Sequence, residues 1–221
     1  MSEPKTIDVM CRNVVTAVPD TPFKELVATV IATDVRDIPV IDPIGRPLGV
    51  VSEADLATKL EFHGGAIHPP LLGGSRWRAQ WHKAAGTRAG ELMTAPAVVV
   101  TGETPLRTAL HVLTGEQASM LCVVNEAGTL VGVLRPHDTL RVFLRGDDCI
   151  RADVERQLFG CDRRSCRVAV HVADGVVTLE GALSVRSAAE RAEWTVRGVP
   201  GVIAVRNNLD FDVDDLMITG L

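Results

Sequence analysis

The apolar positions of this chain form the same series of elements twice. In the first copy, residues 14–18 read as a short strand, and apolar side chains at helical spacing predict a helix over residues 23–33. A short apolar strand over residues 38–41, a turn and a return strand over residues 48–51 complete this copy. The second copy repeats the order with a strand at residues 98–100, a helix around residues 106–113, and strands at residues 121–124 and 131–134.

A constant offset of 83 positions relates the two copies. It leads from Gly49 to Gly132 and from Asp55 to Asp138, and it holds without a gap over more than forty residues. An ungapped offset of this length indicates an internal duplication. Each copy ends in a glycine, a short apolar run and an aspartate at the predicted start of a helix. We therefore expect the function to lie where the two copies meet.

Residues 61–88 separate the copies. Glycines and prolines in the first part predict a loop, and Trp77 and Trp81 then lie at i and i+4, on one face of a short predicted helix. The basic residues of this segment are Arg76, Arg78, Lys83 and Arg88. Three interpretations remain open: a connecting helix that packs its tryptophans on a neighbouring repeat or subunit, a positive lid over an anionic ligand, and a membrane-surface contact.

The pattern changes after a predicted linker at residues 145–148. Apolar residues at i, i+4 and i+8, counted from Ile150, predict an amphipathic helix. Two strands follow, joined by a hairpin turn at Asp174-Gly175. Ser184 is the predicted N-cap of a second helix, and residues 201–209 are predicted to form the closing strand. The order of helix, two strands, helix and strand predicts a small α+β sandwich.

Composition and charge are those of an ordinary globular protein, with 46% hydrophobic and 23% charged residues. A net charge of −5 argues against nucleic acid as the main partner. No apolar run approaches the roughly 18 residues of a transmembrane helix, and the N-terminus lacks the pattern of a signal peptide, so we expect a cytoplasmic protein. The cysteines have no metal-ligand spacing and are expected to be reduced thiols, with a redox switch as the alternative. They are Cys11, Cys122, Cys149, Cys161 and Cys166.

The sequence contains no pattern typical of catalysis. Neither phosphate-binding motif, G-x-x-x-x-G-K or G-x-G-x-x-G, occurs. The histidines are isolated or, like His63 and His68, lie in a Gly/Pro-rich loop, and His171 falls on the outward face of a predicted strand. We therefore expect neither a catalytic site nor a metal site.

The duplicated half, about residues 7–144, resembles a pair of cystathionine-β-synthase (CBS) domains, and the C-terminal part is similar to a BON (bacterial OsmY and nodulation) domain. The first resemblance rests on Val9-Met10 with Leu92-Met93-Thr94, Asp20-Thr21-Pro22 with Glu103-Thr104-Pro105, Ile38-Pro39-Val40-Ile41-Asp42 with Leu121-Cys122-Val123-Val124-Asn125, and the two glycine-to-aspartate stretches. The second rests on the stretches from Asp174 to Gly181 and from Gly201 to Leu209.

Together these resemblances imply a bacterial CBS–BON protein of mixed α+β and α/β class. Its expected fold is a tandem CBS pair (a Bateman module) followed by a small α-β-β-α-β sandwich. The expected boundaries are 7–60 and 89–144 for the CBS repeats, 61–88 for the linker with its Trp/Arg-rich short helix, and 149–213 for the BON domain.

The CBS resemblance implies two clefts, related by pseudo-twofold symmetry, that bind adenosine compounds such as AMP, ADP, ATP or S-adenosylmethionine. In each cleft a carboxylate at a helix start accepts the ribose hydroxyls, as in dinucleotide sites, and the helix N-terminus favours phosphate oxygens. One cleft is expected to use Ser52, Asp55, Val98, Leu121 and Cys122. The other is expected to use Asp138, Arg135, Val15, Arg36, Ile38 and Pro39.

Each cleft departs once from the family pattern. Cys122 stands in place of a proline, so adenine stacking should weaken only modestly. Arg135 replaces the usual threonine or serine and brings a permanent fork of donors that can pair with phosphates, so we hypothesise that its cleft prefers phosphorylated ligands. The alternative for Asp55 and Asp138 is a helix cap without a ligand.

The resemblances therefore predict a non-catalytic regulatory protein that binds an adenosine ligand and signals through a homodimer and its BON domain. The alternative is a ligand-free dimeric adaptor, attached through the BON domain to a membrane surface or a protein partner. The BON half itself offers no chemistry, and its dispersed arginines do not identify anionic lipid as the partner.

Overall fold

The computed structural model describes residues 3–61, 81, 83–159 and 168–216. The chain divides into two compact units, which we treat separately. One comprises Lys5–Thr139 and holds both copies of the duplication, and the other begins at Leu140. Most of the predicted Trp/Arg-rich helix, including Trp77, lies outside the described residues.

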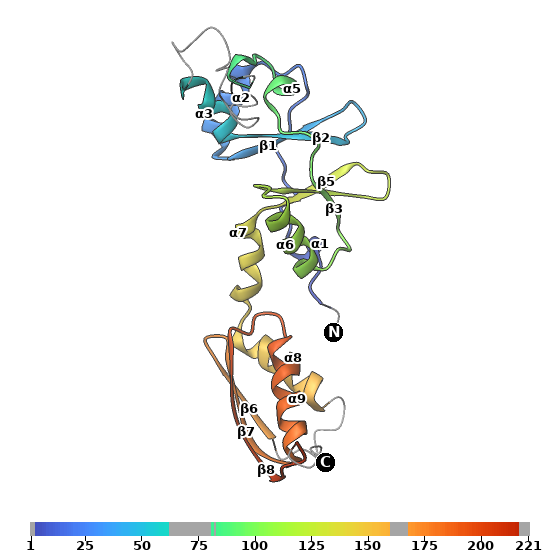
Figure 1. Ribbon diagram of the computed structural model, residues 1–221, viewed down its shortest axis with the longest axis vertical. Helices are drawn as coiled ribbons and strands as arrows, with labels where there is room; N and C mark the ends of the chain where they lie inside the picture. The colour runs from blue at the N-terminus through green and yellow to red at the C-terminus, as the bar shows by residue number, and fades with distance from the viewer. Residues whose placement is uncertain (1–2, 62–80, 82, 160–167, 217–221) are drawn as a thin grey trace. The chain divides into compact units, whose positions relative to one another are not determined.

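The first copy contains a helical segment on either side of an antiparallel hairpin. Its elements are α1 (Thr6–Val9), α2 (Phe23–Thr33), β1 (Asp37–Ile41), β2 (Pro47–Ser52) and α3 (Glu53–Glu61). The second copy contains α5 (Ala89–Leu92), β3 (Val99–Thr101), α6 (Leu106–Gly115), β4 (Leu121–Val124), β5 (Leu130–Leu134) and α7 (Pro136–Thr139). Helices α2 and α3 cover one side of the β1–β2 hairpin, and α1 and α6 lie on one side of the β3–β5 sheet (Figure 1).

The hairpins of the two copies share register and turn geometry. Ile38 pairs with Val51, and the residues 83 positions later, Leu121 and Leu134, pair in the same way. The two turns need glycine, because residue 45 has φ of 82° and its counterpart, residue 128, has φ of 79°. The predicted hairpins are therefore present, with the predicted turn chemistry.

The predicted strand at residues 14–18 is not formed. Only Ala17 is bridged there: its N–H donates to Pro39 O at 2.9 Å and its carbonyl accepts from Ile41 N at 2.9 Å. In the second copy the corresponding segment is the three-residue strand β3, which pairs in parallel with β4. A parallel partner so far away in sequence leaves little local signal for the length of the strand.

The two copies exchange their opening helices. Val9 and Met10, at the end of α1, are buried in the core of the second copy. Ala89 and Leu92 of α5 are buried in the core of the first copy. Backbone bonds fix the exchange, because Cys11 and Val133 bond each other twice at 2.9 Å, and Thr94 and Val50 pair likewise at 2.8 and 3.0 Å. The copies are therefore interlocked into one unit.

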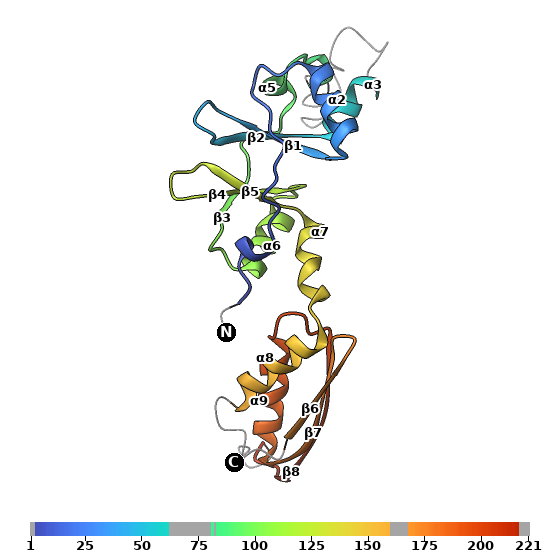
Figure 2. The same ribbon diagram turned by 180° about the vertical axis from the view of Figure 1, so that it is seen from behind.

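The C-terminal unit is a three-stranded sheet with helices on one face (Figures 1 and 2). After the short 3-10 helix η1 (Leu140–Leu144), its elements are α8 (Asp147–Phe159), β6 (Val168–Ala173), β7 (Val176–Val185), α9 (Arg186–Arg197) and β8 (Ala204–Val213). The strand order is β6-β7-β8, antiparallel and then parallel. Ile150, Val154, Val177, Leu179 and Val196 form the centre of its core.

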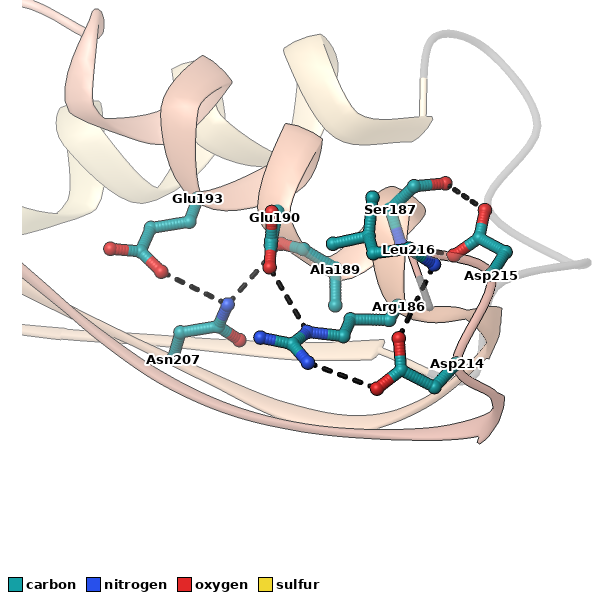
Figure 3. Close-up of polar contacts among 9 residues, drawn as sticks. All are labelled: Arg186, Ser187, Ala189, Glu190, Glu193, Asn207, Asp214, Asp215 and Leu216. Carbon is teal, nitrogen blue, oxygen red and sulfur yellow. Dashed lines mark hydrogen bonds and ion pairs between the residues drawn. The ribbon is translucent and has the colours of Figure 1, made fainter. Parts of the chain in front are cut away.

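The start of α9 corrects one expectation. Ser184 is still part of β7 and does not cap the helix, whose N-cap position is Val185. Instead the carboxylate of Asp215, beyond β8, accepts hydrogen bonds from Ser187 N at 2.9 Å and Ser187 Oγ at 2.6 Å (Figure 3). Beside it Arg186 donates to Asp214 Oδ2 at 2.9 Å (Figure 3). The cap comes from a residue that is distant in sequence.

His171 lies on the outer face of the sheet, as expected. It is exposed, and its cross-strand neighbours are Thr178 and, one strand further, Arg206. None of the helices in the described ranges is long and apolar enough to cross a membrane.

Candidate functional site

A cavity of about 560 Å³ opens between the two copies. Residues 36–37 and 50–55 of the first copy face residues 94–98 and 116–120 of the second across it. The residues on its wall that carry the chemical argument are Ser52, Asp55, Thr94, Val98, Ser119 and Met120. We call this cavity the first cleft.

A capping interaction at the β2–α3 junction holds the carboxylate of the first cleft. Ser52 ends the strand, and its Oγ accepts a hydrogen bond from Asp55 N at 3.1 Å. In return, Asp55 Oδ2 accepts from Ser52 N at 2.9 Å and from Ser52 Oγ at 2.7 Å. This reciprocal pattern is a capping box, and it orients the carboxylate towards the cavity wall. The Asp55 side chain keeps 13% of its surface exposed.

A lysine from the segment between the copies covers the other oxygen of that carboxylate. Lys83 Nζ lies 2.6 Å from Asp55 Oδ1 and 2.6 Å from Thr94 Oγ1. Lys59 holds the same segment by donating to the carbonyls of Ala84 and Gly86 at 2.8 and 2.6 Å. The ammonium of Lys83 therefore bridges the two copies at the first cleft.

A second cavity, of about 760 Å³, is the symmetric counterpart of the first, and we call it the second cleft. It is lined by Asp34, Arg36, Asp37, Ser119, Arg135, Pro136 and His137. Each of these residues has its counterpart, 83 positions away, on the wall of the first cleft. The duplication has therefore produced two clefts related by pseudo-twofold symmetry, and Arg36, Asp37 and Ser119 line both.

Asp37 is the buried acid between the clefts, with only 8% of its surface exposed. Burial raises the pKa of its carboxyl group above the usual value, and the nearby charge of Asp55 adds to the increase. A hydrogen bond from Ser119 Oγ at 2.7 Å opposes it. Because Asp37 lines both cavities, a ligand bound in either cleft would lie near this carboxyl group.

The carboxylate of Asp138 is held differently from that of Asp55. Arg135 donates to it from its backbone N, from Nε and from Nη2, at 3.0, 3.0 and 3.3 Å. His137 Nε2 lies 3.2 Å from Oδ1. Burial raises the pKa of Asp138, but the hydrogen bonds from Arg135 outweigh it and lower that pKa below the usual value. The side chain of Asp138 has no exposed surface.

The structure brings only some of the expected site residues together. Ser52, Asp55 and Val98 line the first cleft, whereas Leu121 and Cys122 are fully buried within β4 and do not reach its wall. Burial raises the pKa of the Cys122 thiol to about 11, in keeping with a small apolar group inside the strand.

At the second cleft, Arg36 and Arg135 lie on the wall, and Asp138 is outside the lining, hydrogen-bonded to Arg135. Ile38 and Pro39 are buried in β1, and Val15 is half-buried outside the lining.

Sequence reasoning missed Thr94, Lys83, Asp37 and Ser119. Thr94 stands in the motif Leu92-Met93-Thr94, which marks the duplication but does not by itself indicate a role in the site. The apolar residues within β1 and β4 are buried, so the first residue of β1 and the positions just before each strand reach the cavity instead. Lys83 has no counterpart in the duplication, and no repeat signal could have found it.

The chemistry of the first cleft suits a nucleoside. A carboxylate flanked by the hydroxyls of Ser52 and Thr94 can accept hydrogen bonds from a ribose diol. Val98 and the neighbouring Pro96 and Ala97 give an apolar wall for a flat base. Among the described residues, no three metal-ligating side chains come together as a metal site.

Comparison with solved structures gives the same fold. CBSX2, a CBS-pair protein of Arabidopsis thaliana, was solved in complex with AMP; it is 26% identical, the match covers 63% of this chain and 96% of that chain, and the TM-score is 0.53. The CBS domain pair of protein MJ0100, in complex with 5′-methylthioadenosine and S-adenosyl-L-methionine, is 17% identical over 64% of this chain and 97% of that one, with a TM-score of 0.51. An uncharacterized conserved protein from Pyrococcus horikoshii is 18% identical over 66% and 97%, with a TM-score of 0.50. The last two show likeness of fold alone.

No curated protein matches the chain. Family models do match: the CBS domain at residues 7–61 and 89–145, and the BON domain at residues 146–212. The pair of repeats, the two symmetric clefts and the α-β-β-α-β unit agree with both matches. The chain therefore belongs to the CBS-domain family, as a CBS pair followed by a C-terminal BON domain.

Proposed function

We propose that this protein is a non-catalytic regulator that binds an adenine nucleotide or adenosine derivative in the first cleft. One observation carries the proposal: Asp55 presents a carboxylate beside Ser52 and Thr94 on the wall of a cavity of about 560 Å³. The AMP complex of CBSX2, at 26% identity, supports adenosine as the common part of the ligand.

In this proposal the ribose hydroxyls donate to Asp55, the base lies against Val98, and the 5′ substituent extends towards Arg36. Asp55 Oδ2 already accepts two hydrogen bonds from Ser52, so the ribose competes with Lys83 for Oδ1. The N-terminus of α3, at Glu53, adds backbone N–H groups that favour phosphate oxygens. Ligand binding would therefore displace Lys83 from Asp55 and break this contact between the linking segment and the first copy.

The response is proposed to pass through a cytoplasmic homodimer and the BON domain. Ile31 of α2 and Leu60 of α3 are exposed apolar residues, which suits helices that meet a second copy. A change in the dimer on ligand binding would then alter how the BON domain binds its partner.

The test is isothermal titration calorimetry of the full chain with adenosine, AMP, ADP, ATP and S-adenosylmethionine. At least one should bind, and Asp55→Asn should weaken that ligand by tenfold or more, because the amide replaces one carboxylate acceptor with a donor. Asp42→Asn, in the hairpin turn away from the cleft, is the matched control and should leave affinity unchanged. No binding of any of these ligands to the wild type would contradict the proposal.

A second candidate function is favoured by one surface feature. Trp194 on α9 is 74% exposed, and Arg197 lies 6.0 Å from its ring centroid. An exposed tryptophan beside an arginine suits attachment to a membrane interface or a partner protein. In this alternative the CBS pair is a ligand-free dimeric adaptor. Sedimentation with anionic liposomes, compared between the wild type and Trp194→Ala, tests the membrane form of it.

A further inference from the structure

The two clefts differ in what holds their carboxylates. We propose that Arg135 blocks the second cleft to ribose, so that each chain binds one adenosine ligand, in the first cleft. This inference rests on the proposed function, since it assigns the ligand to one of two symmetric cavities.

Arg135 occupies both oxygens of Asp138. Its Nε lies 3.0 Å from Oδ2 and its Nη2 lies 3.3 Å from Oδ1, which is the two-point fork that guanidinium groups form with carboxylates. The backbone N of Arg135 adds a third bond to Oδ2, and His137 lies 3.2 Å from Oδ1. An ionised carboxylate offers about four acceptor positions, and Arg135 alone takes three of those of Asp138.

The carboxylate of the first cleft is more accessible than that of the second, because the Asp55 side chain is 13% exposed and the Asp138 side chain is fully buried. Ser52 Oγ takes the position that Arg135 Nε takes in the other copy, and it reaches only Oδ2. The remaining oxygen of Asp55 meets Lys83, whose side chain comes from 28 residues away and is 21% exposed. Lys83 can leave without breaking the cap at Ser52 and Asp55, whereas in the second copy the residue that pairs with the carboxylate also donates its backbone N to it.

Displacing Arg135 is unfavourable for electrostatic reasons. Asp138 is fully buried, and separating a buried ion pair leaves a charge that the two hydroxyls of a ribose compensate poorly. Larger side chains also flank the carboxylate of the second cleft, because Arg135 and His137 stand where Ser52 and Ala54 stand in the first. The hypothesis that Arg135 pairs with ligand phosphates therefore gives way to pairing within the protein.

The experiment measures stoichiometry in the full chain by equilibrium titration with AMP and, separately, with S-adenosylmethionine. The wild type should bind one ligand per chain and lose it in Asp55→Asn. Arg135→Ser restores the serine found at the matching position of the first cleft and should bind two. The combined R135S/D55N variant should bind one, in the second cleft, with an affinity within about tenfold of the wild-type site.

A second variant protects the test against misfolding. R135S/P136E/H137A copies the sequence Ser52-Glu53-Ala54-Asp55 onto the second junction, and it should also bind two ligands per chain. Adding Asp138→Asn to R135S or to R135S/P136E/H137A should return the stoichiometry from two ligands per chain to one.

The outcomes separate the two proposals. Two ligands bound per wild-type chain, or wild-type binding that survives Asp55→Asn and is lost in Asp138→Asn, overturns the role of Arg135 while the binding function stands. One ligand per chain in folded R135S and in the triple variant also overturns it. No binding to the wild type or to either variant overturns the proposed function itself.

Discussion

Replacing Lys83 by methionine should strengthen the binding of adenosine. Methionine keeps most of the aliphatic length but removes the ammonium that contacts Asp55 Oδ1 and Thr94 Oγ1, both at 2.6 Å. The ribose then no longer displaces an ion pair when it binds. The affinity of the first cleft for adenosine should therefore rise.

The size of the effect follows from burial. A charge-assisted hydrogen bond contributes about 1.5–3 kcal/mol net, and a fully exposed ion pair about 0–1 kcal/mol. The Lys83 and Asp55 side chains are 21% and 13% exposed, which places this pair between the two cases, at about 1–2 kcal/mol. Such a change corresponds to an increase in adenosine affinity of roughly five- to thirtyfold.

Calorimetric titration with adenosine, which carries no phosphate, measures this directly. Lys59→Met is the matched control, because Lys59 donates to the carbonyls of Ala84 and Gly86 and not, among the described residues, to the cleft carboxylate. It should change adenosine affinity by less than Lys83→Met does. Weaker or unchanged adenosine binding in a folded Lys83→Met protein would refute competition and make Lys83 a ligand contact instead.

Three further predictions concern the fold. Gly132→Ala should cost about 1–3 kcal/mol in chemical denaturation, because a Cβ there would lie 2.7 Å from Met10 Sδ; Gly115→Ala, whose Cβ would meet nothing within 4 Å, should cost nothing and serves as the control. Asp215→Asn should lower the melting temperature of the C-terminal unit at pH 7, because hydrogen bonds from the start of α9 lower the pKa of this carboxyl group. A lowered native pKa gives stability that is present above the ordinary value of 3.8 and is lost as the pH falls through the native pKa. The difference in melting temperature between wild type and variant should therefore vanish in strong acid. Since burial raises the pKa of Cys122 to about 11, iodoacetamide at pH 8 should modify this thiol only after unfolding, as mass spectrometry of tryptic peptides would detect; modification in the native protein would contradict its burial.

Local chemistry explains why much of the fold could be predicted. The hairpin turns depend on glycines at residues 45 and 128, which adopt positive φ. The short apolar runs beside them, β1 and β4, are buried in both copies. Because the offset has no gap, the hairpin and the helix start predicted in the first copy also predict those of the second. In the C-terminal unit, Asp174-Gly175 fixed the turn between β6 and β7.

Contacts between distant segments could not be predicted in this way. The cap of α9 comes from Asp215, about thirty residues after the helix starts, and the prediction of the nearby Ser184 as the cap is wrong. The same reason applies at the site, where Lys83 reaches Asp55 from outside both copies. Burial was also underestimated, because helices cover β4 and leave Leu121 without access to the cavity.

The exchange of α1 and α5 has a consequence for how the CBS pair can be divided. Each copy, expressed alone, would carry a helix with no core to enter and would lack the helix that completes its own core. Val9 and Leu92 would both be left in water, and burying such a side chain contributes about 1.5–3 kcal/mol. Two separate half-chains should therefore stay largely unfolded until they are mixed, and then assemble as complementing fragments.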